Sequence, residues 1–237
     1  MIGLGTIINV ALIIAGGIAG LLFGKFIKES MQETMIKATG LACLFIGLSG
    51  ALAKMLTVEN GVFSTQRAMM ATVTLALGAF IGELINIEKL FEDFGEWLKV
   101  KSGNASDNSF VNAFLTTSLT ISIGAMAIVG SIQDGILGDY STLATKGILD
   151  FVIVMIMTSS LGKGSIFAAI PVAVFQGIMT ISAKLLSSVM STGAIDNVSC
   201  VGSILIFGVG VNLLFGKTVK IANLLPAVIL AVIAAYL

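Results

Sequence analysis

Histidine is absent from this chain of 237 residues, and Asp, Glu, Lys and Arg together make up only 11% of it. The missing histidine removes the commonest metal ligand and the usual proton shuttle at neutral pH. A soluble domain carries roughly a quarter charged residues, so the chain does not have the composition of one. The only cysteines, Cys43 and Cys200, lie in apolar segments without a CxxC pattern, and we expect both to be packing residues.

Motifs of known catalytic chemistry are absent as well. The sequence contains no GxSxG or HExxH motif and no convincing nucleophile–base pair. We therefore predict no enzymatic activity, no metal site and no cofactor. Because the net charge is zero, the charge balance points to no partner, and we predict no nucleic-acid partner.

Apolar residues make up 57% of the chain, and several apolar runs exceed about 18 residues, enough to cross a lipid bilayer as a helix. Backbone groups in lipid must bond within their own segment. We therefore predict an all-α, polytopic transmembrane helix bundle, with residues 1–237 as a single transmembrane domain. Hydropathy and helix breakers place about eight spans, or seven if the Ser- and Thr-rich fourth one is dropped. They are residues 4–24, 36–56, 66–86, 109–132, 141–162, 165–188, 196–215 and 219–237.

The distribution of positive charge predicts the orientation of these spans. With the N-terminus outside the cytoplasm, nine positive residues fall in inner loops and three fall in outer loops or ends. The inner ones are Lys25, Lys28, Lys37, Lys89, Lys99, Lys101, Lys163, Lys217 and Lys220, and the outer ones are Lys54, Arg67 and Lys184. Cytoplasmic loops carry an excess of Lys and Arg, so we predict that both termini lie outside.

The polar stretch after the third span, IEKLFEDFGEWLKVK at residues 87–101, has apolar residues at helical spacing and charges between them. This pattern predicts an amphipathic helix in the cytoplasmic interface, with Trp97 at the level of the lipid headgroups.

Two charged residues fall inside the fifth predicted span. Lys146 and Asp150 are four residues apart, so they share one face of a helix and can pair. A charge near the bilayer centre is costly and usually has a partner or a function. Either Asp150 is an ion or proton site with Lys146 as its counter-charge, or the two form a neutralising salt bridge that only fixes helix packing.

Amides and prolines lie in several other spans. Asn9, Gln176, Asn212 and Asn223 can line a polar path for an ion or solute, or they can join helices by hydrogen bonds. Each proline in a helix frees the carbonyl four residues earlier, and the only two are Pro171 and Pro226. These helix breaks either expose carbonyls to a solute or are simple kinks.

Residues 131–139, SIQDGILGD, are predicted to form a tight turn between the fourth and fifth spans. Gln133 and Asp134 then form the outer mouth of a polar path, with Asp150 deeper along it, because the turn carries two carboxylates and no basic residue. Asp139 or Ser141 caps the following helix. The alternative is an ordinary solvated turn.

The chain resembles a bacterial membrane family known only as domain of unknown function 554. The stretches that carry the resemblance are GTIINVALIIAGGIAGLLFGKFI, LGAFIGELINIE, GAMAIVGSIQDGILGD, TKGILDF, AIPVAVFQG and VKIANLLPAV. The chain departs from the family's pattern at Phe151, where glycine is common. The resemblance implies a polytopic protein of the bacterial plasma (inner) membrane, and it implies no particular substrate, cofactor or activity.

Two functions remain in competition. The charged pair, the amides and the prolines favour a small transporter or channel for a small solute or cation. The glycine-rich spans are equally compatible with a membrane scaffold or partner subunit that does not transport. A small glycine-rich bundle is also a candidate homo-oligomer. The segment LLFGKFIK at 21–28 returns as LLFGKTVK at 213–220, which indicates either an internal duplication or recurring membrane-helix features.

Overall fold

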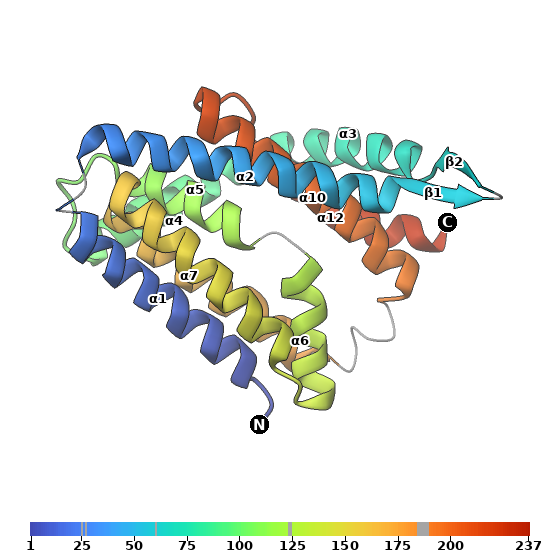
Figure 1. The fold of residues 1–237 in the computed structure, drawn as a ribbon, viewed down its shortest axis with the longest axis horizontal. Coiled ribbons are helices and arrows are strands. Elements are labelled where there is room, and N and C mark those ends of the chain that lie inside the picture. Colours follow the sequence, from blue (N-terminus) through green and yellow to red (C-terminus); the bar gives the residue numbers. More distant parts are fainter. Residues whose placement is uncertain (25, 27, 60, 123–124, 184–189) are drawn as a thin grey trace. The chain divides into compact units, whose positions relative to one another are not determined.

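The computed structural model describes residues 1–24, 26, 28–59, 61–122, 125–183 and 190–237. Its elements follow the chain in this order (Figure 1): α1 (Leu4–Gly24), α2 (Glu29–Met55), β1 (Leu56–Glu59), β2 (Val62–Thr65), α3 (Ala68–Ile85), α4 (Ile87–Lys101), α5 (Phe110–Ser122), α6 (Ala125–Leu137), α7 (Ser141–Leu161), the 3-10 helix η1 (Lys163–Ala168), α8 (Ala169–Ile181), α10 (Thr192–Phe215), α11 (Ile221–Leu224), α12 (Pro226–Ile233) and the 3-10 helix η2 (Ala234–Tyr236). The predicted all-α, polytopic architecture is confirmed.

The chain forms two compact units that interleave along the sequence. Unit 1 comprises Met1–Thr39, Lys89–Ser122 and Met126–Leu186, and unit 2 comprises Gly40–Glu88, Ile123–Ala125 and Ser187–Leu237. Several parts of the predictions lie outside the described residues: Lys25 and Lys184 of the charge comparison, residues 123–124 of the fourth span, and residues 184–188 at the end of the sixth.

Six described helices are long and apolar enough to cross a membrane: 4–24, 30–55, 68–85, 141–161, 163–181 and 192–215. A seventh is added if residues 110–122 and 126–137, which differ in direction by 63°, count as one broken span. The predicted eighth span is a shorter apolar helix over residues 221–236. By length and composition, the described chain thus supplies six or seven candidate spans: the predicted fourth span is a bent pair of helices, and the predicted eighth is shorter than the others.

The predicted turn at residues 131–139 is largely wrong. Helix α6 continues to Leu137, so Gln133 and Asp134 are helical. The chain turns at Gly138, whose φ of 69° suits glycine because it has no Cβ. Gly135 serves close packing instead, since a Cβ there would collide with the Thr180 carbonyl.

A β-hairpin that the sequence analysis missed follows α2 (Figure 1). Strands β1 and β2 pair antiparallel, from Leu56 opposite Thr65 to Glu59 opposite Val62. Gly61, with φ of 77°, lies between the strands. The sequence Asn-Gly at 60–61 is a typical hairpin signal that could have predicted it.

In unit 1, α1 and α7 pack in parallel along most of their length (Figure 1). A Cβ added to Gly16 would collide with the Phe151 carbonyl, and one added to Gly20 would collide with the Met155 carbonyl. The absence of both side chains lets the two backbones approach closely. The backbones of α1 and α7 can therefore approach closely at Phe151 even though this position is not glycine, because Gly16 of α1 leaves the necessary space.

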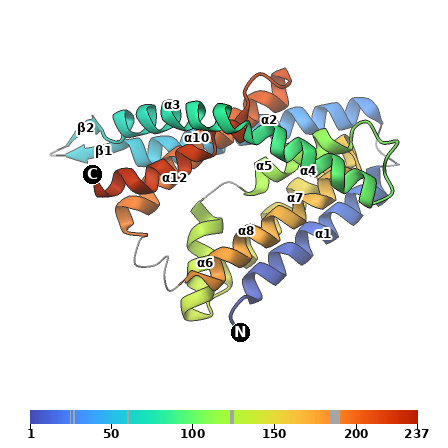
Figure 2. The same ribbon diagram turned by 180° about the vertical axis from the view of Figure 1, so that it is seen from behind.

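The other helices of unit 1 run against this pair (Figure 2). Thr6 contacts Thr180 and Gly17 faces Ile166, so α8 with η1 is antiparallel to α1. Contacts between Ile121 and Lys146 at one end, and Ser109 and Gly162 at the other, make α5 antiparallel to α7. Buried apolar side chains from α1, α5, α7, η1 and α8 form the core between them: Ile13, Ile121, Val154, Ala168, Ala169 and Val172.

Helix α4 has the bounds predicted for the amphipathic helix. Its Leu98 is buried in an apolar cluster with Phe110 and Phe114 of α5, whereas Trp97 is exposed and stacks on Phe94. The one-sided burial agrees with the predicted amphipathic character. Its position at the membrane interface remains a prediction.

Unit 2 uses the same small-residue packing. Gly47 of α2 lies against the backbone of Phe207 in α10, and Lys54 contacts Asp196, so these two helices are antiparallel. Gly78 and Gly82 of α3 face Ala227 and Asn223, in α12 and α11 respectively. The glycines at these crossings act as packing positions within the unit.

Candidate functional site

The centre of the candidate site is a buried ion pair in the middle of α7. Lys146 and Asp150 are only 6% and 3% exposed, and the Lys146 ammonium donates to Asp150 Oδ2. The same ammonium donates to the Ile121 carbonyl at 2.7 Å. Ile121 lies in the last turn of α5, where carbonyls lack an intrahelical donor. The predicted pair therefore forms, and it also joins α7 to the end of α5.

Asn9 of α1 lies beside this pair. The α1–α7 contact places Asn9 opposite Gly147, where a Cβ would lie 3.4 Å from Asn9 Oδ1. The Asn9 amide is fully buried and interacts with the Asp150 carboxylate. Among the described residues, however, neither its Oδ1 nor its Nδ2 has a partner in hydrogen-bonding geometry.

Gln176 of α8 lies at the same level of unit 1. Thr6 of α1 pairs with Thr180 of α8, and the two helices are antiparallel. Gln176 precedes Thr180 by one turn, so it lies level with the next turn of α1, which contains Asn9. Its side chain is 1% exposed, and neither amide atom is hydrogen-bonded within the described part of the chain. Two fully buried amides with unused hydrogen-bonding groups therefore lie at the level of the ion pair.

Asp134 adds a second buried carboxylate. Its Oδ2 accepts the Gly5 backbone N–H at 3.0 Å, at the N-terminal end of α1, where the helix favours negative charge. Its Oδ1 has no partner among the described atoms, although the side chain is fully buried. The prediction placed Asp134 at the outer mouth of a polar path, with an ordinary solvated turn as the alternative, and the structure buries its side chain completely. Neighbouring Gln133 is half-buried and accepts the Thr142 hydroxyl at 2.8 Å.

Within the described residues, every buried side-chain polar atom without a hydrogen-bond partner belongs to unit 1. These residues are Asn9, Ser118, Ser122, Ser131, Asp134, Thr158 and Gln176. The four hydroxyl residues were missed by the sequence analysis. Serine and threonine are common in packed membrane helices, so only the unusual Ser and Thr content of residues 109–132 could have indicated three of them, and nothing in the sequence singles out Thr158.

The other two predicted amides lie in unit 2 and have complete partners. Asn212 Oδ1 accepts the Thr218 and Val219 N–H groups, and its Nδ2 donates to the Val219 carbonyl at 2.7 Å. Asn223 Oδ1 accepts the Glu88 N–H at 2.7 Å, and its Nδ2 donates to Glu83 Oε2 at 2.7 Å. Both side chains hold chain segments together, as the packing alternative expects.

The two prolines stand at the starts of helices. Pro171 lies in the first turn of α8, and Pro226 is the first residue of α12, where a helix needs no N–H donor. The carbonyl of Phe167 accepts the Ala169 N–H, and that of Ala222 accepts the Leu225 N–H. Both carbonyls that were expected to be free therefore have backbone donors.

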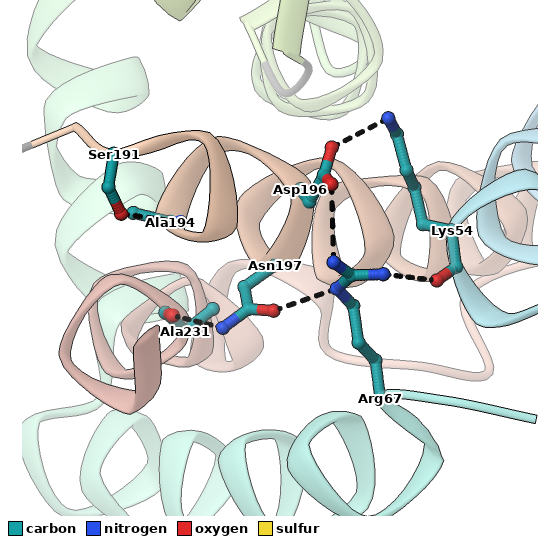
Figure 3. Close-up of polar contacts among 7 residues, drawn as sticks. All are labelled: Lys54, Arg67, Ser191, Ala194, Asp196, Asn197 and Ala231. Carbon is teal, nitrogen blue, oxygen red and sulfur yellow. Dashed lines mark hydrogen bonds and ion pairs between the residues drawn. The ribbon is translucent and has the colours of Figure 1, made fainter. Parts of the chain in front are cut away.

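A second polar cluster, in unit 2, was missed by the sequence analysis (Figure 3). Asp196 pairs with Lys54 at 2.7 Å and with Arg67 at 3.2 Å. Arg67 also donates to Asn197 Oδ1 at 3.1 Å and to the Lys54 carbonyl at 2.9 Å, and Asn197 donates to the Ala231 carbonyl. The side chains of Lys54, Arg67, Asp196 and Asn197 bond one another or nearby main-chain carbonyls. The cluster thereby ties the start of α10 to α2, α12 and the segment before α3.

The described residues contain no cluster of the side chains that most often ligate divalent metals. No three His, Cys, Asp or Glu side chains come together there as ligands. Both cysteines are buried free thiols. The polar groups around Lys146 and Asp150 are oxygens and amides, which suit a hard cation or a small polar solute.

Comparison with known proteins agrees with a membrane protein. A family model described as "Protein of unknown function (DUF554)" matches residues 4–236. The chain is 30% identical over 226 residues to the uncharacterized membrane protein YdfK of Bacillus subtilis (strain 168), covering 95% of this chain and 93% of that protein. It is 27% identical over 232 residues to the uncharacterized protein YqgA of Escherichia coli (strain K12), covering 96% and 94%. No solved structure matches the chain significantly.

Proposed function

We propose that this membrane protein, which belongs to the DUF554 family of proteins of unknown function, is a small transporter or channel for a small solute or cation. The observation that carries the proposal is the concentration of unpartnered buried polar atoms in unit 1, the unit that also holds the buried Lys146–Asp150 pair. Unit 2 buries polar side chains too, but those described there have partners.

Buried polar groups without partners lower the stability of the folded protein. A buried polar group that loses its hydrogen bonds costs about 1–3 kcal/mol, and seven residues of unit 1 carry such atoms. A unit whose only task is structural gains nothing from this arrangement, because apolar side chains would pack there at lower cost. A unit that binds or passes a polar solute needs these groups, because they replace the hydration shell of the solute.

The scaffold alternative has less support. It requires glycine faces that are free to associate with another protein. Gly16, Gly20, Gly47, Gly78 and Gly82 instead lie against helices of their own unit. The predicted homo-oligomer concerns other surfaces and is independent of this argument.

The proposal includes residence in the bacterial plasma membrane with every predicted span crossing it and both termini outside the cytoplasm, which requires the bent segment 110–137 and the short helix 221–236 both to cross the membrane. Lysine and arginine counts support this orientation. The helix directions within unit 1 are compatible with it, since α1 and α7, both proposed to run from outside to inside, are parallel.

Flux measurements in proteoliposomes test the proposal. The purified protein should move at least one member of a panel of monovalent cations and small metabolites. Gln176→Leu should lower that flux at least about tenfold, as expected if one hydrogen bond of roughly 1.4 kcal/mol is lost in the rate-limiting state. Gln66, an exposed residue of unit 2, provides the matched control, and Gln66→Leu should behave like wild type. Absence of flux for the whole panel, or equal flux in both variants, would contradict the proposal.

A further inference from the structure

We propose that the ligand of unit 1 is an inorganic monovalent cation, and that the Lys146 ammonium occupies its site as a tethered substitute when no cation is bound. This inference rests on the proposed function and names its substrate class. It is carried by the juxtaposition of three buried charged side chains, Asp134, Lys146 and Asp150, with the fully buried amide of Asn9.

The charges of these groups do not balance. Asp134, Lys146 and Asp150 are the only charged side chains that are buried among the described residues of unit 1. When ionised, they carry two negative charges and one positive charge. An uncompensated charge in a low-dielectric interior is costly, so one further positive charge stabilises the cluster. A monovalent cation supplies that charge, whereas a divalent cation would leave an excess of the opposite sign.

The ligands around the Lys146 ammonium suit such a cation. The ammonium is held by Asp150 Oδ2 and by the Ile121 carbonyl, the latter at 2.7 Å. The Asn9 amide adjoins the same carboxylate and has an unused oxygen. A carboxylate, a main-chain carbonyl at a helix end and an amide oxygen are hard oxygen ligands, which bind alkali cations in place of water.

Asp134 gives the ammonium a second position. A Cβ at Gly5 would lie 2.9 Å from the Leu143 Cβ and 3.1 Å from Asp134 Oδ2, so Asp134 is level with Leu143. Leu143 precedes Lys146 by three residues on α7, a rise of about 4.5 Å. Lysine side chains are long, and in helices they lean toward the N-terminus, which here is the direction of Asp134. The unpartnered Asp134 Oδ1 can therefore accept the ammonium when a cation takes its place at Asp150.

This exchange keeps the cluster neutral in the bound state. The cation pairs with Asp150, and Lys146 pairs with Asp134. When the cation leaves, Lys146 returns to Asp150 as the structure records. Lys146 therefore competes with the cation for one site, and its removal should strengthen cation binding.

Thermal unfolding of the full-length protein in detergent tests this competition. The chlorides of lithium, sodium and potassium are compared with choline chloride at the same ionic strength, about 150 mM. At least one metal chloride should raise the Tm of the wild type above its value in choline chloride. In Lys146→Met the same cation should act at a concentration at least about tenfold lower, with a Tm rise of about 2–4 °C or more at saturation.

Three further variants define the site. Lys146→Met combined with Asp150→Leu should lose the cation response, since its carboxylate ligand is gone. Asn9→Leu in the Lys146→Met background should weaken the response. Lys37, which forms an exposed ion pair with Glu33, provides the control, and Lys37→Met should respond like wild type.

Several results would overturn the inference. One is equal Tm values in choline and all metal chlorides for both wild type and Lys146→Met. Another is a Lys146→Met variant that stays unfolded in every salt while the Lys146→Met, Asp150→Leu variant folds. A response to pH without any response to metal cations would identify a proton as the missing positive charge. A cation-dependent Tm without any flux would support the cation site and contradict the transport function. Flux of a neutral solute without a cation response would support transport and contradict the cation site.

Discussion

Replacing Gly16 by alanine should force α1 away from α7 and destabilise unit 1. The new methyl group would collide with the Phe151 carbonyl, which belongs to a helix backbone and cannot rotate aside. Overpacking of a tight contact costs about 1–3 kcal/mol, and we place this case near 3 because backbone is involved. Alanine is favoured over glycine in a helix by about 1 kcal/mol, so the net loss should be about 2 kcal/mol.

For a protein of this size, that loss lowers the Tm by about 4–8 °C. Gly177 of α8 is a matched control, because a Cβ there meets nothing within 4 Å. Gly177→Ala should keep or raise the Tm, since only the helix-propensity gain remains. Thermal unfolding of both variants in the same detergent gives the comparison. If Gly16→Ala were as stable as Gly177→Ala, the close parallel packing of α1 on α7 would be refuted.

Three other perturbations have defined outcomes. In choline chloride, Lys146→Met should lower the free energy of unfolding by about 3–5 kcal/mol because Asp150 is left unpaired. Adding Asp150→Leu should recover most of this loss, and additive effects of the two changes in unfolding experiments would disprove the pairing. The Ser141 N–H and hydroxyl hold the pKa of the Asp139 carboxyl below its ordinary value. The ionised carboxylate therefore stabilises α7 fully at a pH above the Asp139 pKa of the unfolded chain, and this stabilisation is lost as the pH falls through the Asp139 pKa of the folded protein. Wild type and Asp139→Ala should therefore differ in Tm at pH 6 to 7, about two units or more above the ordinary Asp pKa, and converge at acidic pH, whereas a constant difference would exclude the titration. Arg67→Met should cost about 2 kcal/mol, measured by unfolding, because three hydrogen bonds within unit 2 are lost; a wild-type Tm would show that the cluster contributes nothing.

Local sequence patterns predicted the elements that local physics determines. Helices at 4–24 and 87–101 have the predicted bounds, because apolar periodicity and flanking glycine or charge define them. The Lys146–Asp150 pair follows from helical spacing alone. No tertiary information was needed for any of these.

Contacts between distant segments could not be predicted in this way. The Ile121 carbonyl is a ligand of Lys146 only because α5 ends beside α7. Asp134 looked like a turn residue because two glycines follow it closely, but Gly135 serves helix packing and only Gly138 turns the chain. A glycine that permits a turn and a glycine that permits close approach look the same in one sequence. The hydrogen-bond partners of Asn212 are Thr218 and Val219, six and seven residues further along the chain. They reach Asn212 only because the loop after α10 folds back on that helix.

The interleaving of the two units has a consequence for biosynthesis. Helix α1 packs on α7, yet Leu161 comes 137 positions after Gly24, and α2 and α3 are made in between. At about 5–20 residues per second, α1 waits about 7–27 s in the membrane before its partner is complete. During that time its Asn9 amide and glycine face are open to lipid or to other nascent helices. Slowed translation between residues 24 and 161 should therefore increase misassembly, and a membrane insertase that shields α1 should reduce it.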